Sequence, residues 1–203
     1  MITVYHLNRS RSLRILWLLE ELGVDHTVER FERDATTGLA PPELRALHPL
    51  GKSPMIRIDG QLVTESAAIV EVICAAHAPE MVPPVGTEAY IRHLELMHFA
   101  EGSAMTPILL NLYISRLKEA GEPLRPRIES ELHSHFSYME TQLRPSGHFV
   151  LDQFSAVDVM LSFPAQIMQR YGMGAEFPKL SGFVDALQSR PAFQRAVEAA
   201  GGD

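Results

Sequence analysis

Cysteine is almost absent from this sequence, which contains one, Cys74, among 203 residues. A single cysteine can form neither an intramolecular disulfide nor a Cys-x-x-Cys redox motif. The residues around it, from Val72 to Ala76, are apolar, which is typical of a buried, unreactive thiol. Any thiol chemistry carried out by the chain must therefore use a thiol that a substrate brings.

Runs of basic residues and long apolar runs are also lacking. The net charge is −7 and lysine and arginine are scattered, which argues against a nucleic-acid partner. No apolar stretch reaches the roughly 18 residues of a membrane-spanning helix. The amino terminus, from Met1 to Tyr5, is typical of a strand rather than of a signal peptide. We expect a globular cytoplasmic protein with no membrane partner.

Histidine is plentiful, with nine copies, but not at metal-ligand spacing. His133 and His135 lie two positions apart, and His93 and His98 lie five apart. Neither pair would share a helical face in the way that metal ligands require. No metal site is predicted.

The first third of the chain alternates short strands with helices. We expect strands over Ile2–Leu7 and His26–Phe31, a helix from Leu13 that Gly23 ends, and a short helix over Pro41–Leu47. The parallel crossover and the hairpin that follows predict a small mixed sheet with helices on its faces.

The stretch from His48 to Ile73 carries the most specific signals. Asp59-Gly60 tolerates positive φ at both positions and so predicts a two-residue hairpin between Met55–Ile58 and Gln61–Thr64. Ser53-Pro54 is a bend before the first of these strands. Glu65-Ser66 then opens a helix, where we expect a capping hydroxyl and free N–H groups that attract a carboxylate.

A proline-rich connector divides the chain. We expect a first domain over residues 1–78, a linker over 79–86 and an all-helical domain over 87–203. Thr87–Ala120 is predicted as one long helix, bent at Pro107. Ser155 and Asp158 have the spacing of a capping box at the start of a later helix, a structural role without chemistry.

The Ser53-Pro54 bend, the hairpin and the Glu65-Ser66 helix start together resemble the cytosolic glutathione transferases, and in particular their bacterial, serine-type members. The capping box and residues 189–193 resemble that family too, so the likeness covers essentially the whole chain. It implies a thioredoxin-like first domain, a cis bond before Pro54, and glutathione as co-substrate without a metal.

The resemblance also implies roles for individual residues. The backbone of Ser53 would pair with the cysteinyl part of glutathione, while Glu65 and Ser66 would hold its γ-glutamyl end. Lys52 would face the glycyl carboxylate, although a solvated surface lysine is an equally good interpretation. Electrophile-binding residues would come from the helical domain, with Met97, Met105 and Tyr113 as candidates that could equally be core.

Family members stabilise the glutathione thiolate with a hydrogen bond from a Tyr, Ser or Cys near the end of the first strand. The candidates here are Tyr5, Ser10 and Ser12. In serine-type members the hydroxyl lies four residues before an arginine of the first helix, and Ser10 stands in that relation to Arg14. We therefore expect Ser10 to be the donor, Ser12 to be the helix N-cap and Tyr5 to pack in the strand, with the choice among the three open.

The function expected from the resemblance is transfer of glutathione to a hydrophobic electrophile by a homodimer. Glu101 would approach the glutathione of the partner subunit, although a solvated helix charge is the simpler interpretation. Two alternatives stay open. One is a glutathione-dependent isomerase or disulfide reductase; the other is a non-catalytic or transcription-associated protein that keeps the fold.

Overall fold

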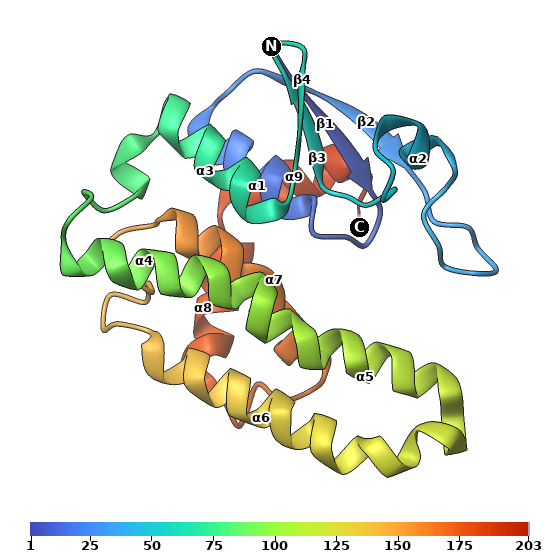
Figure 1. The fold of residues 1–203 in the computed structure, drawn as a ribbon. Coiled ribbons are helices and arrows are strands. Elements are labelled where there is room, and N and C mark those ends of the chain that lie inside the picture. The colour runs from blue at the N-terminus through green and yellow to red at the C-terminus, as the bar shows by residue number, and fades with distance from the viewer. Residues whose placement is uncertain (203) are drawn as a thin grey trace. The chain divides into compact units, whose positions relative to one another are not determined.

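The structure is a computed structural model, and it describes residues 1–202. The chain divides into two compact units (Figure 1). Residues 1–79 together with 188–202 form the first unit, and residues 80–187 form the second. The sequence division differs in one respect, because it placed the last helix with the helical domain.

A four-stranded mixed sheet is the centre of the first unit. Its strands are β1 (Ile2–Leu7), β2 (His26–Phe31), β3 (Met55–Ile58) and β4 (Gln61–Thr64), in the order β2-β1-β3-β4. The helices of this unit are α1 (Leu13–Leu22), α2 (Glu43–Leu47), α3 (Ser66–His77) and α9 (Pro191–Ala200). β1 runs parallel to β2 and antiparallel to β3, and β3 runs antiparallel to β4. This is the predicted thioredoxin-like arrangement.

β1 is buried on both faces, as expected for a central strand that helices cover. Tyr5 and Leu7 pack with Leu44 of α2 and with Met55 of β3. Because successive side chains of a strand point to opposite faces, His6 lies on the other face, where α1 and α3 contact the sheet. The end of β1 therefore directs His6 toward the segment that begins α1.

The turns follow the predicted backbone chemistry. Asp59 and Gly60 have φ angles of 48° and 85°, which are the positive values that a two-residue hairpin with this twist needs. Gly23 ends α1 with φ 61°, and the N–H of the next residue, Val24, donates to the Leu19 carbonyl at 3.0 Å. The sequence signals for both turns are confirmed.

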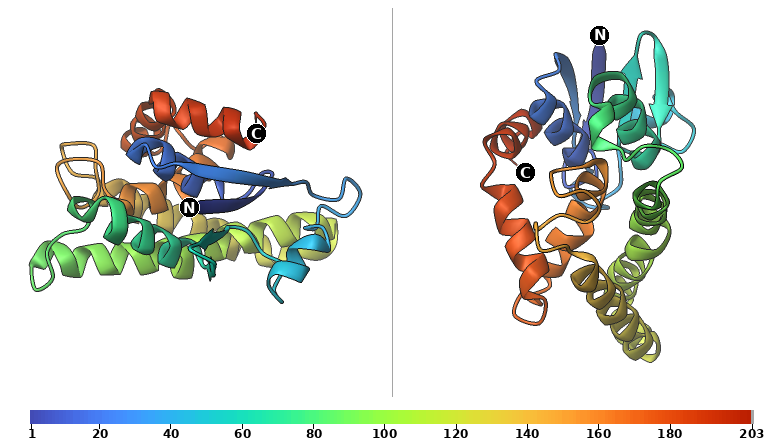
Figure 2. Two further views of the ribbon diagram at one scale, coloured as in Figure 1. Left: turned by 90° about the horizontal axis from the view of Figure 1, so that it is seen from above. Right: turned by 90° about the vertical axis from the view of Figure 1, so that its left-hand side faces the viewer.

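The last helix, α9, packs against α1 (Figure 2). The ring of Phe193 meets that of Trp17 edge to face, with centroids 5.6 Å apart. Arg190 donates two hydrogen bonds to the carboxylate of Glu21. Burial, the largest influence, raises the pKa of Glu21, but the hydrogen bonds from Arg190 and Trp17 and the charges of the arginines outweigh it and lower the pKa. These contacts explain why α9 groups with the first unit.

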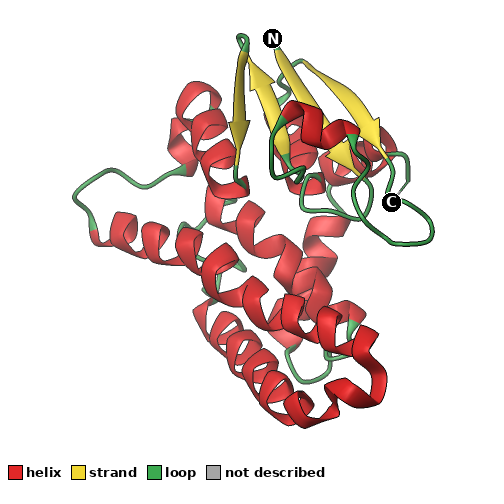
Figure 3. Cartoon of the chain, turned by 45° about the vertical axis from the view of Figure 1, so that its right-hand side comes forward, coloured by secondary structure: helices red, strands yellow, loops and turns green. Residues whose placement is uncertain are grey.

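The second unit is helical, and all four strands described in the chain lie outside it (Figure 3). Its α-helices are α4 (Glu88–Phe99), α5 (Met105–Leu117), α6 (Arg125–Gln142), α7 (Ala156–Arg170) and α8 (Pro178–Gln188). The shorter helical turns are η1 (Pro79–Met81), η2 (Ala100–Ala104) and η3 (Lys118–Leu124). In the part of the chain that the structure describes, no helix is long and apolar enough to cross a membrane.

A π-helical turn, η2, joins α4 to α5 where one bent helix was predicted. Pro107 has no N–H to donate to the carbonyl of Ser103, and its ring crowds that carbonyl. A wider turn upstream relieves the crowding. The hydroxyl of Thr106 donates to the Gly102 carbonyl at 2.9 Å and so adds a bond within this turn. The irregularity therefore precedes Pro107, and α5 ends at Leu117 rather than at Ala120.

The capping box of α7 is confirmed. The N–H and the hydroxyl of Ser155 both donate to the Asp158 carboxylate, at 2.7 and 2.8 Å. Asp158 is fully buried and also accepts from the N–H of Phe149 at 3.0 Å. A carboxylate with this many donors fixes both the start of α7 and the loop before it.

Candidate functional site

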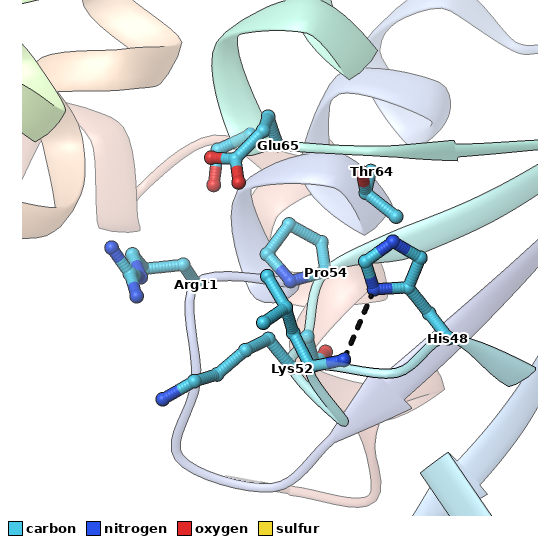
Figure 4. A pocket seen from close by; sticks show the side chains of 9 residues that line it. Arg11, His48, Lys52, Pro54, Thr64 and Glu65 are labelled. Carbon is cyan, nitrogen blue, oxygen red and sulfur yellow. Dashed lines mark hydrogen bonds between the residues drawn. The ribbon is translucent and has the colours of Figure 1, made fainter. Parts of the chain in front are cut away.

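A cavity of about 220 Å³ opens at the edge of the sheet in the first unit (Figure 4). Its lining consists of Arg11, His48, Leu50, Lys52, Ser53, Pro54, Thr64, Glu65 and Ser66. Five of the six predicted site residues, from Lys52 to Ser66, are thus brought together. The sixth, Ser10, does not line the cavity.

The loop before β3 forms one wall of this cavity. The peptide bond between Ser53 and Pro54 is cis, as the sequence resemblance implied. The hydroxyl of Ser53 donates to the Tyr5 carbonyl at 3.0 Å, which ties the loop to the end of β1. This bond holds the backbone of Ser53 in a fixed position beside the cavity.

The start of α3 forms the opposite wall. Glu65 precedes the helix with φ 69° and ψ 121°, a backbone conformation that costs a non-glycine residue free energy and that recurs at functional sites. The predicted side-chain cap is wrong, because no side chain caps this helix. The hydroxyl of Ser66 instead accepts a hydrogen bond from Nη2 of the buried Arg14 at 3.1 Å. Since a guanidinium is only a donor, the proton of Ser66 is left for another acceptor.

Two cationic side chains and a histidine also line the cavity. Arg11 comes from the loop before α1, while Lys52 comes from the loop before β3. Nδ1 of His48 accepts from the N–H of Leu50 at 3.4 Å, which is the dashed line in Figure 4. Together with the N-terminus of α3, these groups favour an acidic ligand. Lys52 was a candidate from the sequence, whereas Arg11 and His48 were missed. His48 begins the stretch that carries the most specific signals, and Arg11 stands between the candidate donors Ser10 and Ser12.

Ser10 is buried, with 8% of its surface exposed. Its Oγ is 3.4 Å from Oγ of Ser53 and 2.7 Å from Oγ of Ser12. The backbone N–H of Ser12 also donates to it, at 3.2 Å. The hydroxyl therefore stands next to the residue that was expected to hold the cysteinyl part of a tripeptide.

Ser12 occupies the N-cap position of α1, but the prediction that its hydroxyl caps the helix is wrong. That hydroxyl is turned toward β1 instead, where it is 2.9 Å from Nδ1 of His6. Tyr5 packs against Phe31, and its hydroxyl accepts from Nε of Arg57 at 3.1 Å. These contacts favour the packing role predicted for Tyr5.

Two further sequence predictions can be placed in the structure. Glu101 lies in the π-helical turn η2 of the second unit, and its predicted approach to a partner subunit stays a prediction. Within residues 1–202, no group of three or more His, Cys, Asp and Glu side chains is arranged to hold a metal ion.

Two family models match the chain. The model described as "Glutathione S-transferase, N-terminal domain" matches residues 9–76, and "Glutathione S-transferase, C-terminal domain" matches residues 96–191. The chain is 33% identical over 215 aligned residues to "Glutathione S-transferase 3" of Schizosaccharomyces pombe, covering 98% of this chain and 87% of the relative. It is 24% identical to "Glutathione S-transferase 1" of Saccharomyces cerevisiae, covering 98% and 95% of the two chains.

Solved structures show the same likeness. A glutathione S-transferase from Actinobacillus pleuropneumoniae superimposes with a TM-score of 0.89 at 29% identity, covering 100% of this chain and 94% of that one. A glutathione transferase homologue from Lodderomyces elongisporus, crystallised with two glutathione molecules per subunit, has a TM-score of 0.81 at 23% identity and 97% coverage of both chains, which shows the shared fold. The chain belongs to the glutathione S-transferase family.

Proposed function

We propose that the protein binds glutathione in the cavity between Pro54 and Ser66 and activates its thiol for attack on a hydrophobic electrophile. The observation that carries this proposal is the convergence of the cis Ser53-Pro54 bend, the start of α3 and two cationic side chains, Arg11 and Lys52, on one cavity. Oγ of Ser10 lies 3.4 Å from Oγ of Ser53, which lines this cavity. The family membership of the chain supports the same activity.

The charges of the cavity suit the tripeptide from end to end. The γ-glutamyl carboxylate would accept hydrogen bonds from the hydroxyl of Ser66 and from N–H groups at the start of α3. A helix N-terminus favours such an anion. Glu65 would accept from the γ-glutamyl ammonium group. The backbone of Ser53 would pair with the cysteinyl residue, and Lys52 and Arg11 would meet the glycyl carboxylate.

The proposed role of Ser10 is to donate a hydrogen bond to the thiolate. A free thiol has a pKa of about 8.5 and is mostly protonated at neutral pH. A hydrogen bond to a charged group is worth about 1.5 to 3 kcal/mol, and one pKa unit corresponds to about 1.4 kcal/mol. One such bond thus suffices to lower the pKa by about one to two units and to make the thiolate a major species near neutral pH.

The thiolate then attacks the electrophile. A carbon–sulfur bond forms with the electron pair of sulfur, and a leaving group departs with the electron pair of the bond that breaks. No proton has to be removed in this step, because the thiol is already ionised. The protein's task is therefore to bind glutathione, to hold its sulfur and to favour the anion.

Family membership supports two further proposals, which are a homodimer and a cytoplasmic location. Glu101 and the candidate electrophile-binding residues Met97, Met105 and Tyr113 belong to the same set of proposals. These four residues belong to the second unit, whereas the cavity proposed to bind glutathione lies in the first.

The proposal is tested by calorimetric titration with glutathione, followed by turnover of a panel of electrophiles and disulfides. We expect binding, and faster turnover of halogenated aromatic compounds than of disulfides. Preferred reduction of disulfides would favour the reductase alternative. An absence of glutathione binding would contradict the proposal and favour a protein that keeps the fold without the chemistry.

A further inference from the structure

A chain of buried hydrogen bonds connects Ser10 to β1. Oγ of Ser10 is 2.7 Å from Oγ of Ser12, which is 2.9 Å from Nδ1 of His6. All three residues are buried, with His6 1% and Ser12 0% exposed. Because a serine hydroxyl has a single proton, the direction of each bond in this chain determines the direction of the next.

The proton of Ser53 is already committed, because the Ser53 hydroxyl donates to the Tyr5 carbonyl at 3.0 Å. The contact between Ser53 and Ser10 at 3.4 Å is therefore one in which Ser10 donates. Ser10 can thus send its proton in one of two directions, either toward Ser53 and the cavity or back toward Ser12. Donation to a thiolate requires the direction toward the cavity.

The distance of 2.7 Å between Ser10 and Ser12 requires a proton between the two oxygens. If Ser10 supplies that proton, it has none left for a thiolate. If Ser12 supplies it, the proton of Ser10 remains available for the cavity. Stabilisation of a thiolate by Ser10 therefore demands that Ser12 donates to Ser10.

Once Ser12 donates to Ser10, it has no proton for His6. The 2.9 Å contact between Ser12 and Nδ1 of His6 must then carry the proton of the imidazole, which is the tautomer with hydrogen on Nδ1. The opposite tautomer would accept the proton of Ser12 and would leave Ser10 as the donor to Ser12. The tautomer of one buried histidine thus decides whether the site has a free donor.

We propose that His6, with its proton on Nδ1, and Ser12 are positioning residues that direct the hydroxyl proton of Ser10 toward the sulfur of bound glutathione. This inference rests on the proposed function, in which Ser10 is the donor. His6 and Ser12 do not touch the substrate in this scheme. They act by setting the direction of a hydrogen bond that Ser10 makes.

The first test is the tautomer of His6 in the ligand-free wild-type protein. Nitrogen chemical shifts of the ring, measured by NMR with labelled histidine, distinguish a proton on Nδ1 from one on Nε2. We expect the Nδ1–H form. The Nε2–H form would overturn the inference, and this result needs neither glutathione nor a variant that folds.

The second test is the pH midpoint of thiolate formation in bound glutathione, followed by its ultraviolet absorbance. Ser12→Ala and His6→Leu should raise the midpoint by less than Ser10→Ala does, and by less than the roughly one to two pH units expected for loss of the whole donor. The reason is that Ser10 keeps its proton in both variants and loses only the bonds that direct it toward the sulfur, so glutathione affinity should change little. His6→Asn should keep the wild-type midpoint, because its amide can present an N–H where Nδ1–H stood.

Matched controls separate this role from a general effect of changing a buried residue. Ser162 is a fully buried serine of α7 whose hydroxyl donates to the Val159 carbonyl, and His93 is a histidine of α4 that is 1% exposed. Ser162→Ala and His93→Leu should lower stability without moving the thiolate midpoint.

The two proposals fail in different ways. If Ser10→Ala raises the midpoint and Ser12→Ala does not, the directing role of Ser12 and His6 is wrong while Ser10 remains the donor. If Ser10→Ala itself leaves the midpoint unchanged, the proposed donor is wrong and the inference falls with it. A raised midpoint in both variants, with the Nδ1–H tautomer, supports the whole chain of bonds.

Discussion

The packing of α9 on α1 leads to a quantitative prediction for Phe193→Ala. Phe193 is 7% exposed and meets Trp17, which is 0% exposed, edge to face with an interplanar angle of 76°. Removing a buried aromatic side chain costs about 3 to 5 kcal/mol, of which the edge-to-face contact supplies about 0.5 to 1.5 kcal/mol. We expect the free energy of unfolding of the first unit to fall by about this total.

The assay is equilibrium unfolding in urea, followed by fluorescence and circular dichroism. Trp17 is the single tryptophan of the sequence, and its Nε1 donates to Glu21 at 2.8 Å, the carboxylate that also binds Arg190. Its emission should therefore report directly on the α1–α9 contact. In Phe193→Ala, the emission of the native protein should shift to longer wavelength as water reaches the indole.

A matched control lies in the second unit. Phe183 is 4% exposed and meets Phe149 edge to face, with centroids 5.1 Å apart. Phe183→Ala should destabilise the second unit by a similar amount and leave the native emission of Trp17 unchanged. If Phe193→Ala changed neither the unfolding free energy nor the emission, our reasoning about α9 would be refuted.

Three other predictions concern the site, pH and assembly. Ser66→Ala should weaken glutathione binding by about 1 to 3 kcal/mol, the range for a bond to a charged group, and unchanged affinity by calorimetry would reject the assignment. Burial lowers the pKa of His93 from 6.5, so the unfolded chain takes up this proton first on acidification. The free energy of unfolding should therefore fall as the pH drops below about 6.5, by at most about 1.4 kcal/mol per pH unit. In His93→Leu, urea titrations at several pH values should show a smaller fall, because this histidine no longer contributes to it. The protein should sediment as a homodimer, and a monomer at micromolar concentration would contradict this.

Local signals explain which parts of the structure could be predicted from the sequence. Asp59-Gly60, Gly23 and the Ser155 capping box each act through the backbone of a few neighbouring residues, and each forms as expected. The parallel pairing of β1 with β2 and the antiparallel pairing of β3 with β4 also form as the crossover and the hairpin predicted. Glu65-Ser66 also lies at the start of a helix, as predicted.

Partners that are distant in sequence explain the rest. The hydroxyl of Ser66 accepts a hydrogen bond from Arg14, which lies 52 positions away. The position of Ser66 at a helix start predicts a capping bond and not this distant partner. Ser12 likewise bonds His6 across the end of β1 instead of capping its own helix. The sequence placed residues 191–200 in the all-helical domain. It did not show which surface this helix covers, because Phe193 and Arg190 of this segment contact Trp17 and Glu21, which lie 169 or more positions away.

The role of Ser10 is tested most directly by turnover with glutathione at two pH values. The free thiol, with a pKa of about 8.5, ionises unaided at about pH 9 but not at about pH 6.5. Ser10→Ala should therefore lower turnover by about 10- to 100-fold at the lower pH, the equivalent of one to two pKa units, and far less at the higher pH. An equal loss at both pH values, or a pH-dependent loss in Tyr5→Phe instead of Ser10→Ala, would contradict the account.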